Sequence, residues 1–214
     1  MDIIAAAYGI SGLLMGWKIP ELSQKIMEYK KGTVELNKTL YSKTAKYAVS
    51  MLNGAAWALA GLNVDNPIIA LLIAVQITIC AIIAIIDINI RIIPNECVLL
   101  VAAAGLLFQL MNYGLKALIP ALVSMIVMMA VFTSVAAFVG FGKVGAGDVK
   151  LAGAMGLALG YPLIITGVGI MAAVLLAFIG VGMALKKIAL ASMLPLAPFI
   201  TAGYAGVLIT LLWH

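Results

Sequence analysis

Long apolar runs recur along the whole 214-residue chain, and they restrict its fold more than any other feature. Hydrophobic residues make up 65% of the sequence and charged residues 10%, whereas soluble domains have roughly 45–50% and 25%. A membrane-crossing helix needs about 20 mostly apolar residues. The sequence therefore predicts an all-α fold, a polytopic transmembrane helix bundle of about eight spans that forms one membrane domain over residues 1–214. The spans are expected at residues 3–17, 47–62, 67–86, 97–111, 117–140, 149–160, 163–185 and 188–212.

The run at 149–160 is the shortest of these and is rich in glycine and alanine. Small residues let neighbouring helix backbones approach closely, so this segment is expected to be a tightly packed or broken helix. If it does not cross the membrane, the chain has seven spans instead of eight.

Basic residues indicate how the chain is oriented, because they gather on the cytoplasmic side of membrane spans. The loop at 18–46 holds seven lysines and is expected to be cytoplasmic. Within it, Leu22, Ile26 and Tyr29 follow a helical spacing, which predicts a short amphipathic helix among the lipid headgroups. Counting spans from this loop leaves both termini outside and places further basic residues inside, namely Arg91, Lys143, Lys150, Lys186 and Lys187.

Charge and cysteine content argue against other classes of function. The net charge of +5 comes from basic residues that mostly flank the spans, so the lipid bilayer is the expected partner and nucleic acid is not. Cys80 and Cys97 lie in different apolar runs without Cys-x-x-Cys spacing, which favours neither a disulfide framework nor a zinc ribbon.

Two acidic residues stand out, because ionised groups within or beside membrane spans are costly and are therefore functional candidates. Asp87 follows the apolar run 81–86, and Asp148 follows a glycine-rich turn at 140–147. The alternation of spans puts both carboxyl groups at the cytoplasmic ends of their helices. They can therefore lie at the same depth and approach each other across the bundle.

Two carboxyl groups that share one site hold a proton between them, since both cannot ionise cheaply. Such a pair can activate a water molecule against a peptide carbonyl and help the amine to leave. Each acid also has a simpler interpretation. Asp87 could pair with Arg91 four residues later, and Asp148 could cap the N-terminus of a helix.

Three motifs resemble those of the type IV prepilin peptidases and their archaeal preflagellin-peptidase relatives, a family of intramembrane aspartyl proteases named for a GxGD motif. Residues 145–151, Gly-Ala-Gly-Asp-Val-Lys-Leu, are similar to the family's GxGDxKL motif. Asp87 with Pro94 and Asn95 resembles its first aspartate motif. Residues 194–199, Leu-Pro-Leu-Ala-Pro-Phe, are similar to a late Pro-x-x-Pro-Phe segment.

The resemblance covers the chain from residue 67 onward and implies that Asp87 and Asp148 are the catalytic pair of a prepilin leader peptidase. It implies pilin-like precursors with basic leaders as substrates, cut after a glycine at the cytoplasmic face of the cell membrane. Lys150 also fits a role in topology or at lipid headgroups. The other motif residues are expected in the active-site loops, namely Gly145, Gly147, Lys150, Pro94, Asn95, Pro195 and Pro198.

The sequence departs from the larger bacterial members of this family in one respect. Those proteins carry a longer cytoplasmic insert with paired cysteines, and they also methylate the new N-terminus with S-adenosylmethionine. Here the insert comprises only residues 18–46 and has no cysteine. Methyltransferase activity is therefore left open, and neither a metal nor another cofactor is implied.

A small transporter or channel that uses paired acids as a proton or cation relay is the alternative from another class, and a non-catalytic assembly factor is a third. A transporter should show related halves with corresponding broken helices, whereas the glycine-rich break occurs once. Of the remaining polar residues, Gln76 and Gln109 are expected to hydrogen-bond to neighbouring helices, and Glu96 to form a surface salt bridge.

Overall fold

The computed structural model describes residues 2–32, 41–139, 145–186 and 194–213. Within these ranges the chain forms eight α-helices and two short 3-10 helices, and no strand. The predicted all-α fold is therefore confirmed. The helices are α1 (Asp2–Lys31), α2 (Lys43–Asn63), α3 (Pro67–Ile90), α4 (Asn95–Tyr113), η1 (Leu115–Ala117), α5 (Leu118–Val139), α6 (Ala146–Leu159), α7 (Leu163–Ala184), α8 (Ala197–Thr210) and η2 (Leu211–Trp213).

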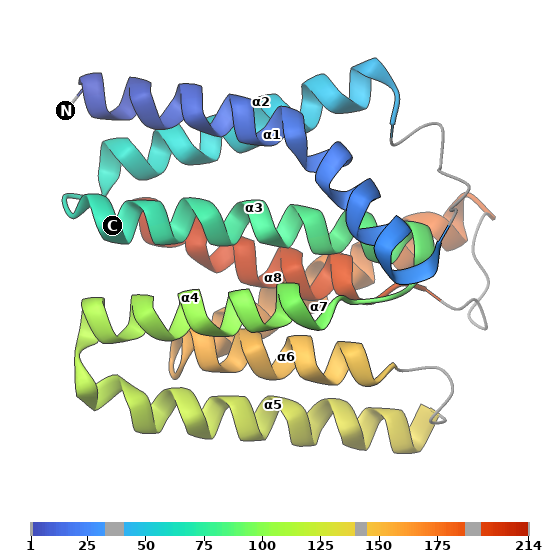
Figure 1. Cartoon of the computed structure of the whole chain (residues 1–214). Coiled ribbons are helices and arrows are strands. Elements are labelled where there is room, and N and C mark those ends of the chain that lie inside the picture. The colour runs from blue at the N-terminus through green and yellow to red at the C-terminus, as the bar shows by residue number, and fades with distance from the viewer. Residues whose placement is uncertain (1, 33–40, 140–144, 187–193, 214) are drawn as a thin grey trace.

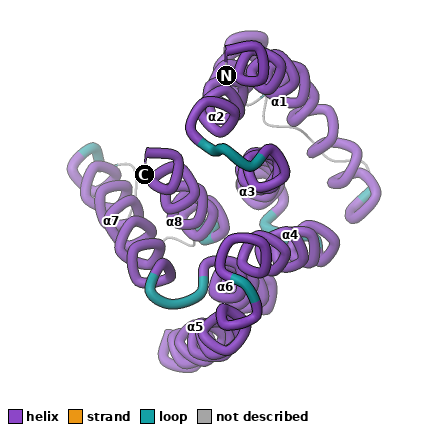
Figure 2. Tube along the Cα trace, turned by 90° about the vertical axis from the view of Figure 1, so that its left-hand side faces the viewer, coloured by secondary structure: helices purple, strands orange, loops and turns teal. Residues whose placement is uncertain are grey.

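The helices lie roughly side by side, as Figure 1 shows. α1 and α2 form a hairpin that packs against α3, and α3 in turn contacts α4 and α8. α6 packs against α4 and α5 on one side and against α7 and α8 on the other, which the end-on view in Figure 2 makes clear. Every α6 residue in the range 151–159 is buried, so this helix forms the centre of its half of the bundle.

Among the described residues, five helices are long and apolar enough to cross a membrane, namely α1, α3, α4, α5 with the preceding η1, and α7. α8 and η2 together form a shorter apolar helix. α6 has 14 residues and is therefore about 21 Å long at 1.5 Å per residue. The protein is a multi-pass membrane protein. The short helix rich in small residues that the sequence predicts is present as α6, at the centre of its half of the bundle.

The first predicted span and the predicted short helix after it form one helix. α1 continues without a break to Lys31, although Pro20 lies inside it. A proline removes one helical hydrogen bond and crowds the preceding turn, which commonly bends a helix, and Figure 1 shows α1 bending along its length. Ile19 and Met27 are fully buried in the main core, so packing against the bundle sustains the helix beyond the proline.

The expected amphipathic segment is thus the second half of α1. Leu22 and Tyr29 are exposed there, whereas Ser23 and Met27 face the protein. Ile26, the third residue of the predicted apolar face, is half-buried and packs against the core, and the position of this segment among lipid headgroups stays a prediction. The last predicted span, 188–212, is helical from Ala197 onward in the structure, and residues 187–193 lie outside the described part of the chain.

Glycines allow α1 and α2 to approach each other closely. A Cβ added to Gly16 would lie 2.7 Å from the Ser50 Cα, so only glycine fits there without a shift of backbone. The Ser50 hydroxyl donates to the Leu13 carbonyl at 2.8 Å, and the Asn53 amide donates to the Gly12 carbonyl at 2.8 Å. These bonds satisfy the polar groups of α2 inside the hairpin.

Two buried glutamines join helices elsewhere in the bundle. The Tyr204 hydroxyl of α8 donates to Gln76 of α3, and the Gln109 amide of α4 donates to the carbonyls of Ala158 and Leu159. The second contact satisfies carbonyls in the last turn of α6, which have no partner within the helix. The predicted role of Gln76 and Gln109 is confirmed.

The hairpin packing leads to a first prediction. Gly16→Leu should lower the midpoint temperature of unfolding in detergent, because overpacking a tight contact costs about 1–3 kcal/mol. Gly180→Leu is the matched control, since nothing lies within 4 Å of a Cβ at that position. Thermal unfolding of both variants beside the wild type checks this, and equal midpoints for the two variants would contradict it.

Candidate active site

Asp87 lies three residues before the end of α3 and is 4% exposed. Its Oδ2 accepts a hydrogen bond of 3.1 Å from the Ala197 N–H, the first residue of α8. The first N–H groups of a helix have no acceptor within that helix, so the carboxylate satisfies one of them. This bond brings the first aspartate motif against the late proline-containing segment.

Asp148 occupies the first turn of α6 and is partly buried. Its Oδ2 accepts a hydrogen bond of 3.0 Å from the Gly145 N–H, and Gly145 is the residue that caps the helix. Asp148 therefore supports the start of α6 from inside the helix, not from the cap position. The same carboxylate remains only partly buried, so a water molecule or a substrate group can still reach it.

The two acids lie close enough for their charges to interact. They come from the C-terminal end of α3 and the N-terminal end of α6, which lie at the same end of the bundle, on the right in Figure 1. Arg91 also interacts with Asp87 electrostatically. It is exposed, however, and within the described residues it forms no ion pair with Asp87.

The GxGD motif and the first aspartate motif also touch directly. Lys150 donates a hydrogen bond of 3.1 Å from Nζ to the Asn95 Oδ1. A Cβ added to Gly147 would lie 3.1 Å from the Ile93 Cβ, so the glycine permits a close approach to the segment between α3 and α4. Pro94 is buried and precedes the first residue of α4, a position where a missing N–H has no cost.

Residues of all three motifs therefore meet at one end of the bundle. Pro195 and Pro198 are half-buried and flank Ala197 in sequence, and Pro198 lies in the first turn of α8. Gly145 is exposed beside Asp148. Lys143 and Lys187 lie outside the described part of the chain.

Sequence reasoning missed two contacts of this region. The N–H of Ala197 is a backbone donor, and no residue type marks such a donor in a sequence. The partner of Glu96 was also missed. Glu96 forms the predicted surface salt bridge, with Lys30 of α1 at 2.6 Å, and the charge pattern around α1 gave no means of choosing Lys30 among its neighbours.

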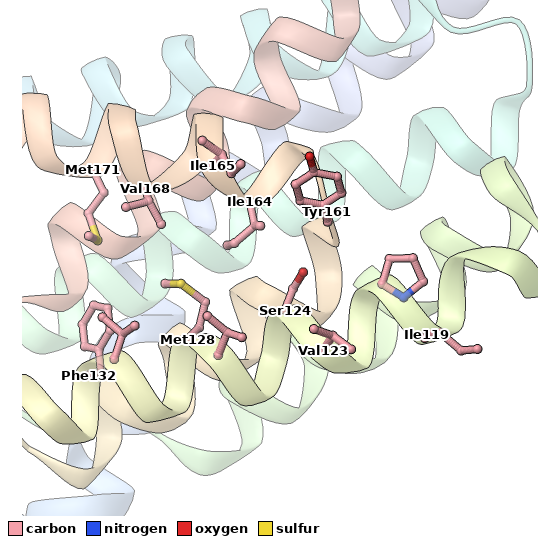
Figure 3. Close-up of a pocket in the computed structure, with 13 residues that line it drawn as sticks. Ile119, Val123, Ser124, Met128, Phe132, Tyr161, Ile164, Ile165, Val168 and Met171 are labelled. Carbon is pink, nitrogen blue, oxygen red and sulfur yellow. The ribbon is translucent and has the colours of Figure 1, made fainter.

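Two interacting carboxyl groups, one buried and one partly buried, can hold a water molecule and exchange protons with it. Among the described residues no group of three or more His, Cys, Asp or Glu side chains is placed to bind a metal ion. An apolar groove of about 620 Å³ lies between α5 and α7, and neither acid lines it (Figure 3).

The fold and these contacts define a multi-pass helical membrane protein with two interacting acids at one end. The model of the type IV leader peptidase family matches residues 74–213. The chain therefore belongs to the type IV leader peptidase family and is a leader-peptidase-like protease. No curated protein and no solved structure matches the chain.

The residues matched by the family model exclude α1 and α2, and yet α1 reaches the site. Lys30 of α1 binds Glu96, and Glu96 follows Asn95, which accepts a hydrogen bond from Lys150 two residues after Asp148. The end of α1 thus supports the segment that joins the two aspartate motifs. This arrangement makes the Lys30–Glu96 pair a candidate for positioning the site from outside the matched region.

Lys30→Glu should therefore lower the kcat of leader cleavage about two- to fivefold, which is the range of a surface ion pair of 0.5–1 kcal/mol. The double variant Lys30→Glu with Glu96→Lys should recover most of the loss, because the pair is restored with its charges exchanged. Steady-state cleavage kinetics in detergent measure both effects.

Lys25→Glu serves as the control for this experiment. Lys25 pairs at 3.5 Å with Glu21 of the same helix, so its substitution leaves the Lys30–Glu96 pair in place. If Lys25→Glu lowers kcat as much as Lys30→Glu, or if the double variant shows no recovery, the Lys30–Glu96 pair does not position the site.

Proposed function

We propose that the protein is an intramembrane aspartyl endopeptidase that removes basic leader peptides from prepilin-like precursors at the cytoplasmic face of the cell membrane. The observation that carries this proposal is that Asp87, at the end of α3, and Asp148, at the start of α6, lie at the same end of the bundle, where hydrogen bonds join their motifs to neighbouring segments. Membership of the leader peptidase family supports the type of reaction. The surrounding motif contacts support a single site built from α3, α4, α6 and α8.

The proposed reaction uses one ionised and one protonated carboxyl group. The ionised group takes a proton from a water molecule, whose oxygen attacks the scissile carbonyl carbon, while the protonated group gives its proton to the carbonyl oxygen. As the C–N bond breaks, the first carboxyl returns its proton to the leaving nitrogen and a hydroxyl of the intermediate returns one to the second. Because the pair titrates as a unit, the two roles belong to the pair.

The distribution of charge supports the cytoplasmic position of the site. Among the described basic residues, Lys116 is the one that lies at the end away from the acids. The others lie in the second half of α1, at the start of α2, or near the acids, as Arg91, Lys150 and Lys186 do. Basic residues are retained on the cytoplasmic side, so the end with Asp87 and Asp148 faces the cytoplasm.

The proposed pair is tested by Asp87→Asn and Asp148→Asn. Each should reduce cleavage of a prepilin-like precursor by at least about 100-fold, the lower range for loss of an acid–base group. Asp65→Asn is the matched control, because Asp65 is an exposed acid in the connection between α2 and α3, at the opposite end. Product masses measured after incubation in reconstituted membranes show whether the cut follows a glycine.

Folding of each variant is verified by its unfolding midpoint and its elution from a sizing column. If a folded Asp87→Asn or Asp148→Asn variant cleaves at the wild-type rate, the carboxyl pair is not catalytic. If the wild type cuts none of a broad panel of precursors, a role as a transporter or an assembly factor takes precedence.

The proposed orientation is tested separately with single introduced cysteines at exposed positions. Lys31→Cys should react with a membrane-impermeant maleimide only after the cells are opened, whereas Lys116→Cys should react in intact cells. The natural thiols of Cys80 and Cys97 are buried, so the unmodified protein provides the background. The reverse pattern of labelling would place the acids on the outer face.

A further inference from the structure

An apolar groove of about 620 Å³ runs between α5 and α7. Figure 3 shows side chains of both helices turned toward it, among them Val123 and Phe132 of α5 and Ile164 and Val168 of α7. Ser124 and Tyr161 are the polar members of its lining. Its surface is therefore suited to hydrocarbon.

The groove exists because α5 and α7 both pack on α6 but make almost no contact with each other among the described residues. On α6, Gly156 approaches the Ser124 backbone of α5, while Gly167 of α7 approaches Met155 and Leu159. The buried face of α6 holds the two outer helices apart. The space between them is left for another molecule to fill.

The groove is longer than the hydrocarbon thickness of one leaflet. Its lining on α5 runs from Ile119 to Phe132, which is about 20 Å at 1.5 Å per residue. Half of the hydrocarbon core of a bilayer is roughly 15 Å. A single acyl chain that enters at the Ile119 end can therefore lie in the groove over its full length.

A second pocket of about 410 Å³ adjoins the groove at that end, and the two share Pro120 and Tyr161. Lys116 and Tyr113 also line this pocket. Lys116 is exposed and forms no ion pair with any residue in the described part of the chain. Tyrosines of this kind are enriched where a membrane meets water.

We propose that the groove and the adjoining pocket together bind one phospholipid with an anionic headgroup, from the leaflet at the end opposite Asp148. One acyl chain lies between α5 and α7, the phosphate lies beside the Lys116 ammonium, and the hydroxyls of Tyr113 and Tyr161 donate to headgroup oxygens. The charge complementarity favours this occupant, since the phosphate of a lipid headgroup supplies an anion to the exposed ammonium of Lys116. The bound lipid fills the space between the two helices that pack on α6. A ligand that binds the folded state raises the stability of the protein.

The test measures lipid binding to the purified, delipidated full-length protein by native mass spectrometry, with phosphatidylglycerol and phosphatidylcholine of the same chain lengths. We expect phosphatidylglycerol to be retained preferentially and to raise the unfolding midpoint more than phosphatidylcholine does. Lys116→Gln should reduce its retention about fivefold, the effect of one lysine near an anionic surface, and remove the preference between the two lipids.

A second pair of variants tests the groove itself. Val127→Trp, which fills the groove, should reduce the retention of both lipids, whereas Val181→Trp should not. Val181 is an exposed residue of α7 outside the groove lining. If Lys116→Gln retains phosphatidylglycerol as the wild type does, or if Val127→Trp and Val181→Trp bind lipid equally, the proposal is wrong.

A photo-crosslinking residue at Val168, used in native membranes, identifies the occupant. A lipid adduct supports the proposal, whereas a crosslink to a precursor or to a second copy of the chain overturns it. These measurements report binding and stability, so their outcome is independent of whether the acids are catalytic.

Discussion

The hydrogen bond from the Ala197 N–H to the Asp87 carboxylate is the interaction on which the arrangement of the site depends. A polar group within a membrane bundle needs a partner inside the protein, because lipid offers none. The Asp87 carboxylate provides an acceptor for the first N–H of α8, and that N–H provides a donor for the carboxylate. The bond therefore joins the ends of two helices that are distant in sequence. α8 also packs against α6 and α7, so the half of the bundle formed by α4 to α8 is joined to α3 through α8 as well as through α4.

α6 is short, buried and held at both ends by side chains. Asp148 accepts from the Gly145 N–H at its beginning, and Gln109 donates to the carbonyls of its last turn. A helix of 14 residues contributes few apolar contacts to lipid, so its position is set by protein contacts. This explains why a potentially reactive acid can be presented from its first turn without loss of order in the helix.

The sequence was sufficient to predict the helical fold, the approximate helix positions and the location of Asp87 and Asp148 at one end, because apolar length and the charge of loops determine them. It could not predict that α1 continues past Pro20, since the burial of Ile19 and Met27 that sustains it is a tertiary effect. Nor could it reveal the Ala197 N–H or the α5–α7 groove. A backbone donor has no residue code, and a groove is a property of the spacing between helices.

The α1–α2 hairpin has a consequence for how the chain enters the membrane. α2 carries Ser50 and Asn53 among its apolar residues, and both bond to α1 carbonyls, so α2 is best transferred into lipid together with α1 as a preformed pair. The Trp57 indole N–H then finds its acceptor only when Thr78 of α3 arrives. Insertion of α2 therefore depends on hydrogen-bond partners from both of its neighbours in the chain, first α1 and then α3.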